Sequence, residues 1–66
     1  MGNVAEKLIE AREKLNKSQI DVCRDLNIPQ STLSNYEQGT RIPKDDMKIV
    51  LAKYYHTSVE DLFFSV

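Results

Sequence analysis

The stretch 18–39, SQIDVCRDLNIPQSTLSNYEQG, constrains the fold most, because a proline interrupts a helical pattern inside it. Apolar residues keep helical spacing as far as Leu26 and resume it at Leu33 and Tyr36. Pro29 has no backbone N–H and cannot sit inside a continuing helix, so a second helix must begin there. The pattern therefore predicts two short helices joined by a tight turn.

Boundary signals mark the outer ends of these two helices. Ser18 precedes the first helix, and Asp21 three residues later completes a capping-box pattern that places a carboxylate in the first turn. Gly39 can adopt the left-handed conformation that ends the second helix. Two short helices joined in this way, with the second polar on its outer face, are typical of a helix-turn-helix.

The stretch resembles the helix-turn-helix of the phage repressor/Cro-like family of small DNA-binding domains. The resemblance covers about residues 4–63 and rests on these features: Gln19, the turn at Asn27 and Ile28, the closing run 36–39, and Arg12, Glu37, Gly39 and Pro43. It implies an all-α, compact five-helix bundle in which the second and third helices form the motif. Residues 1–66 are then expected to form a single domain, since a chain this short has room for one core.

Patterns on either side of the motif predict the remaining helices. The first helix is expected over about residues 4–15, with Asn3 before it as a cap. The fourth is expected over about residues 44–55, after the loop that contains Pro43. A short fifth helix follows Ser58, and its Leu62 and Phe63 are expected to fill the core.

Composition excludes several classes of function. One cysteine and one histidine provide neither a disulfide nor a metal cluster, so no cofactor or metal is expected, and Cys23 is interpreted as a small buried hydrophobe. No nucleophile is paired with a base, so no enzyme is expected, and no small-molecule ligand is evident. No apolar run is long enough to span a membrane, and the sequence favours a soluble cytoplasmic protein.

Net charge is unusual for a DNA-binding domain. Nine Lys and Arg stand against ten Asp and Glu, which gives a net charge of −1, whereas a basic domain is typical. Residues 17–56 carry six cations against five acids, so the motif region is only slightly positive. Specific contacts must therefore contribute more to DNA affinity than bulk electrostatics.

Three residues in or near the motif are expected to hold it together or to contact DNA. The resemblance implies that Arg12 in the first helix pairs with Glu37 at the end of the third; two solvated charges are the alternative. Gln19 opens the second helix, where free backbone N–H groups favour a phosphate. The resemblance adds that Gln19 contacts a phosphate and braces Gln30; a solvated glutamine is the alternative.

The outer face of the third helix, about residues 30–38, is polar and uncharged. Amide side chains can pair bidentately with adenine in the major groove, and hydroxyls can accept or donate. The resemblance implies base readout by Gln30, Ser31 and Asn35, whereas Thr32 and Ser34 are expected to reach phosphates or to flank the groove. The loop cations Lys17, Arg41 and Lys44 are expected to contact the two DNA backbones. An ordinary solvated polar face is the alternative.

The residues at the end of the chain suggest an interface between two copies. Phe64 and Val66 follow the residues expected to fill the core, and exposed apolar residues grouped together mark interaction sites. A homodimer of this kind would read the two halves of a pseudo-palindromic operator. The alternative is that Phe64 folds back onto the first helix and the protein binds as a monomer.

These observations predict a sequence-specific transcriptional regulator, a repressor, that binds double-stranded DNA with its third helix. A protein-interaction module of the same fold, such as an antitoxin that neutralises a partner, is the main alternative, because the net charge is close to zero. A purely structural subunit is a third possibility.

Overall fold

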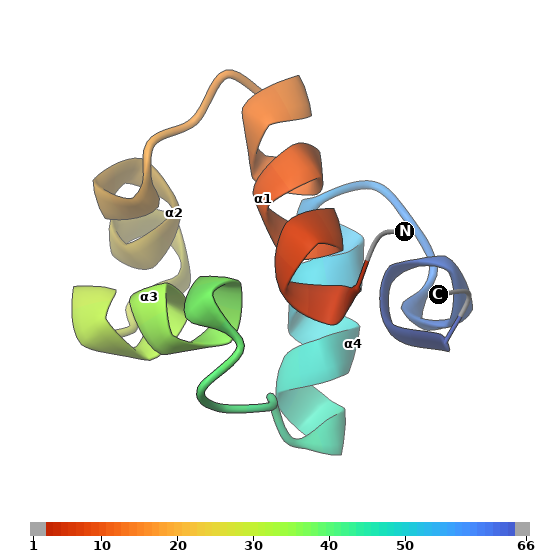
Figure 1. The fold of residues 1–66 in the computed structure, drawn as a ribbon. Coiled ribbons are helices and arrows are strands. Elements are labelled where there is room, and N and C mark those ends of the chain that lie inside the picture. The colour runs from red at the N-terminus through yellow and green to blue at the C-terminus, as the bar shows by residue number, and fades with distance from the viewer. Residues whose placement is uncertain (1–2, 65–66) are drawn as a thin grey trace.

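The computed structural model describes residues 3–64, and Figure 1 shows their arrangement. Four α-helices, α1 (Val4–Lys14), α2 (Gln19–Leu26), α3 (Gln30–Gln38) and α4 (Asp45–Tyr54), are followed by a short π-helix, η1 (Glu60–Phe64). α1 packs against both α3 and η1, and α2 packs against α3. The described residues contain no strand, so the predicted all-α fold with five helices is confirmed. No described helix has the length and hydropathy that a membrane span requires.

The ends of the motif helices follow the local signals in the sequence. The Ser18 Oγ accepts a hydrogen bond from the backbone N–H of Asp21 at 3.1 Å, and the Asp21 carboxylate accepts one from the backbone N–H of Ser18, also at 3.1 Å. The hydrogen bonds from Ser18 lower the pKa of Asp21. Asn27 (φ 57°) and Gly39 (φ 78°) end α2 and α3 in the left-handed conformation. Pro29 stands before α3 without a side-chain cap.

One continuous core joins all five helices. It consists of residues that are at most 5% exposed: Leu8, Val22, Cys23, Leu33, Tyr36, Leu51, Ala52, Tyr55, Leu62 and Phe63. Leu62 and Phe63 thus fill the core as predicted. Cys23 behaves as a small hydrophobe, and burial raises the pKa of its thiol. Val50 is an apolar residue of α4 that is not buried in the core. It is 40% exposed and lines a pocket beside the α3–α4 loop.

The last helix differs in type from the α-helix that the sequence predicts. Ser58 caps it as expected, since its Oγ accepts a hydrogen bond from the backbone N–H of Asp61 at 3.0 Å. Residues 60–64 then adopt the wider π-helical turn. This turn buries the adjacent residues Leu62 and Phe63 together and leaves Phe64 65% exposed.

Two adjacent tyrosines at the end of α4 offer a matched test of packing. The hydroxyl of Tyr55 is buried and has no hydrogen-bond partner among residues 3–64, whereas the hydroxyl of Tyr54 donates to Asp25 Oδ2 at 2.6 Å. Tyr55→Phe is expected to raise the free energy of unfolding by about 1 kcal/mol, because it removes an unsatisfied buried polar group. Tyr54→Phe is expected to lower it. Urea denaturation measures both changes, and destabilisation by Tyr55→Phe would contradict the expectation.

Candidate nucleic-acid interface

α3 presents a polar, uncharged surface because its apolar and charged side chains face inward. Leu33, Tyr36 and Glu37 are its buried residues. The remaining side chains on the outer face and its flanks are exposed (Gln30, Ser31) or half-buried (Thr32, Ser34, Asn35). The inward and outward positions therefore agree with the helical pattern of the sequence.

The ion pair expected from the sequence lies beneath this surface. Arg12 Nε and Nη2 donate to the two carboxylate oxygens of Glu37 at 2.8 and 3.0 Å. The side chains are only 16% and 3% exposed. The hydrogen bond to Glu37 raises the pKa of Arg12. A planar, bidentate pair in this half-buried position fixes the angle between α1 and α3.

Two more hydrogen bonds extend the pair into a network. Arg12 Nη1 donates to the backbone carbonyl of Lys17 at 2.9 Å, and Gln19 Nε2 donates to Glu37 Oε1, also at 2.9 Å. We call these four residues the Glu37 network. It joins α1, the loop before α2, the first turn of α2, and α3. The hydrogen bond from Gln19 goes to Glu37 instead of to Gln30, so the bracing of Gln30 that the resemblance implies is not the contact found.

Hydrogen bonds also orient part of the outer face of α3. The Thr40 hydroxyl lies 3.2 Å from Asn35 Oδ1 and 3.3 Å from the Asn35 backbone carbonyl, and it donates toward them. Gln38 Nε2 donates to Ser34 Oγ at 3.0 Å. Sequence reasoning missed Thr40 as part of this face, because it lies beyond the glycine that ends the helix.

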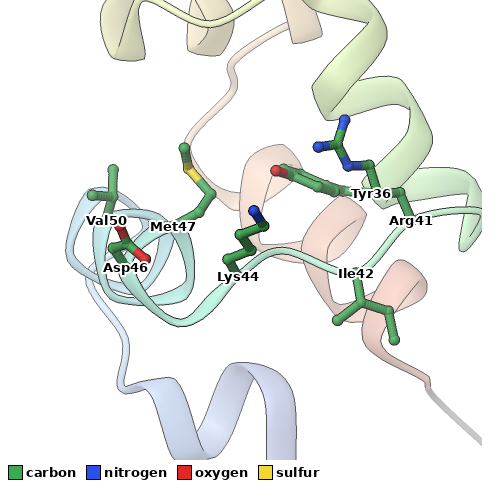
Figure 2. A pocket seen from close by; sticks show the side chains of 7 residues that line it. All are labelled: Tyr36, Arg41, Ile42, Lys44, Asp46, Met47 and Val50. Atoms are coloured by element: carbon green, nitrogen blue, oxygen red, sulfur yellow. The ribbon is translucent and has the colours of Figure 1, made fainter.

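Cations lie in the loops at both ends of the motif. Lys17, before α2, is 3.5 Å from Asp25, which also accepts the Tyr54 hydrogen bond. Arg41 and Lys44, after α3, are exposed. Figure 2 shows Arg41 beside the Tyr36 ring and the Lys44 side chain extending to the same side of the pocket.

The pocket beside the α3–α4 loop, which Val50 also lines, has a volume of about 370 Å³. Ile42, at its edge, is 68% exposed. The pocket therefore combines an apolar wall with a cationic rim.

Phe64 is the exposed apolar residue that the sequence assigns to an interface. Its ring lies 5.0 Å from Lys48 Nζ of α4, a cation–π contact. Val66, the other residue of the predicted interface, lies outside the described residues. In residues 3–64 no group of three or more His, Cys, Asp or Glu side chains is placed to hold a metal ion.

The geometry of α2, the Asn27 turn and the buried and polar faces of α3 defines the class, and the chain belongs to the helix-turn-helix family, whose pattern it matches over residues 8–62. The chain is also similar to the HTH-type transcriptional regulator ImmR of Bacillus subtilis (strain 168). The two are 35% identical over 60 residues, which cover 91% of this chain and 47% of the relative. The chain thus spans about half the length of that relative.

Proposed function

We propose that this protein binds double-stranded DNA sequence-specifically, with α3 in the major groove, and represses transcription. The observation that carries the proposal is the outer face of α3: the side chains of Gln30 and Ser31 are exposed, uncharged, and without a hydrogen bond to any other residue in the range 3–64. The Glu37 network fixes the inner side of this helix to α1 and α2. The similarity to a transcriptional regulator supports the regulatory role.

In this proposal the contacts divide into two groups. Gln30, Ser31 and Asn35 read base edges, because they lie on the outer face or flank of α3 and carry groups that match major-groove donors and acceptors. The second group positions the protein on the phosphates and comprises Lys17, Gln19, Thr32, Ser34, Arg41 and Lys44. Gln19 contributes through its remaining amide hydrogen and the free N–H groups at the start of α2.

We also propose that the protein acts as a homodimer. One recognition helix reads only a few base pairs, so useful specificity needs two half-sites separated by about 34 Å, one turn of DNA. The exposed ring of Phe64 supplies a self-complementary apolar surface, which Val66 would extend. The matching operator is a pseudo-palindrome.

Substitution of single base-reading residues tests the proposal. An operator selected from random DNA is expected to bind Gln30→Ala and Asn35→Ala each about 1–3 kcal/mol more weakly, with relaxed preference at one base pair per half-site. Fluorescence anisotropy with operator variants measures both quantities. Unchanged binding of the two variants would show that α3 is not the reading helix.

Lys44→Ala is the control for nonspecific contributions in the same experiment. A lost phosphate contact is expected to weaken all DNA sequences similarly and to reduce the slope of log K against log salt by about one unit. A sequence-dependent effect of Lys44→Ala would instead place this side chain at a base.

A protein-interaction module, such as an antitoxin, is the second candidate. The pocket with exposed Ile42 and Val50 at its edge favours it, since such apolar surfaces mark protein interfaces. The net charge of −1 also suits a protein partner. Ile42→Ser together with Val50→Ser is expected to leave operator binding intact under the first proposal and to release a co-purifying protein under the second.

A further inference from the structure

We propose that Thr40 is a positioning residue that fixes the side-chain amide of Asn35, so that Asn35 presents N–H donors to a base edge. This inference rests on the proposed DNA-binding function and names a determinant of its specificity. It assigns a role in sequence selectivity to a residue outside the recognition helix.

The backbone places Thr40 where it can act in this way. Gly39 turns the chain through the left-handed conformation (φ 78°), and the backbone N–H of Thr40 then donates to the Asn35 carbonyl at 3.1 Å. This hydrogen bond brings the Thr40 hydroxyl to 3.2 Å from Asn35 Oδ1. The hydroxyl has a single hydrogen, and the two lone pairs of the Asn35 carbonyl already accept the backbone N–H groups of Gly39 and Thr40. The hydroxyl hydrogen is therefore assigned to Oδ1.

The orientation of the amide follows from this contact. With Oδ1 held at Thr40, the two N–H groups of Asn35 Nδ2 point away from the end of the helix. The half-buried position of Asn35 limits other rotamers. Ser34 is oriented in a similar way: its Oγ accepts from Gln38 Nε2 at 3.0 Å, which leaves its hydroxyl hydrogen free to donate. The C-terminal half of α3 therefore presents hydrogen-bond donors.

Donors at this position discriminate among the four bases. In the major groove guanine offers two acceptors, N7 and O6, and thymine offers O4, whereas cytosine offers the N4 donor. Bidentate pairing of Asn35 with adenine needs the amide oxygen turned toward the base, but Thr40 holds that oxygen. Asn35 is therefore expected to favour a G·C pair, whose guanine presents two adjacent acceptors, over an A·T pair by about tenfold.

The experiment compares base preferences of four variants on DNA selected by the unaltered protein. Asn35→Ala identifies the base pair that Asn35 contacts. Thr40→Val, which has the same shape without the hydroxyl, and Thr40→Ala are expected to reduce the preference for G·C over A·T there to less than about threefold. Thr40→Ser, the matched control, is expected to preserve it. Preferences at the other base pairs are expected to stay unchanged in all three Thr40 variants.

The outcomes separate this inference from the proposed function. If the unaltered protein selects a sequence but Thr40→Val and Thr40→Ala keep its full preference at the Asn35 position, Thr40 does not orient the amide. Selection of an A·T pair at that position would also overturn the inference. If the unaltered protein selects no sequence, the proposed function fails and the inference fails with it. Circular dichroism identifies any variant that does not fold. If Thr40→Val or Thr40→Ala does not fold, the other of the two still tests the loss of the hydroxyl.

Discussion

Arg12→Ala is expected to lower the free energy of unfolding by about 3–5 kcal/mol, because it leaves the Glu37 carboxylate buried without its cation. Glu37 is 3% exposed at its side chain, and Gln19 Nε2 would be its one remaining partner in the Glu37 network. Domains of this size have little stability to spare, so the variant should be largely unfolded near its normal working temperature. Urea denaturation followed by circular dichroism measures the loss.

Three further variants test whether the loss of stability in Arg12→Ala comes from the broken Arg12–Glu37 ion pair or from a general sensitivity of the fold to substitution. Glu37→Ala is expected to be less harmful than Arg12→Ala, because the guanidinium is more exposed and keeps its hydrogen bond to the Lys17 carbonyl. The double substitution R12M/E37L replaces both charges with apolar side chains and is expected to be milder than Arg12→Ala. Arg24→Ala, which breaks an exposed pair with Asp21, is expected to change little. Additive losses in the Arg12–Glu37 double-mutant cycle would contradict the coupling.

Phe64→Asp is expected to weaken operator binding about 10²- to 10⁴-fold, because each half-site then binds without the gain from its linked neighbour. The fold should persist, since Phe64 is 65% exposed and its ring lies 5.0 Å from Lys48 Nζ. Analytical ultracentrifugation measures the dimer, and titration of a full operator against a single half-site measures cooperativity.

Ile42→Asp is the matched control for this change. Ile42 is an equally exposed apolar residue, at 68%, but it lies in the α3–α4 loop. Its substitution is expected to preserve the dimer and cooperative binding. Loss of cooperativity in Ile42→Asp but not in Phe64→Asp would move the interface to this loop, and unfolding of Phe64→Asp would assign Phe64 to the core.

The fold was predictable where the determinants are local. A cap at Ser18, a chain break at Pro29 and a left-handed residue at Gly39 each act over a few residues, and each ends or begins a helix where the pattern predicts. The outer helices agree to within one residue at each end: α1 ends at Lys14 and α4 runs from Asp45 to Tyr54. The inward and outward faces of α3 were also predictable, because helical periodicity determines them.

Contacts between distant residues were not predictable in the same way. Gln19 bonds Glu37 across 18 positions, and Tyr54 bonds Asp25 across 29, and no periodic signal links either pair. The Arg12–Glu37 pair was accessible only through the resemblance to a family. The π-helical turn of residues 60–64 escaped prediction because it depends on burying adjacent side chains, which is a property of the assembled core.

The side chains of α3 that stabilise the fold are separate from those proposed to contact DNA. This separation affects how the DNA sequence preferred by such a protein can change. The side chains that stabilise the helix, Leu33, Tyr36 and Glu37, point into the core, and none of them belongs to the surface proposed to read bases. The Gln30 and Ser31 side chains are exposed and make no hydrogen bond with another residue in the range 3–64, so replacing them should alter the preferred operator at little cost in folding stability. Under the proposed function, a new DNA specificity can therefore arise by single substitutions, each passing through a folded intermediate, which makes this helix a natural starting point for both evolution and redesign.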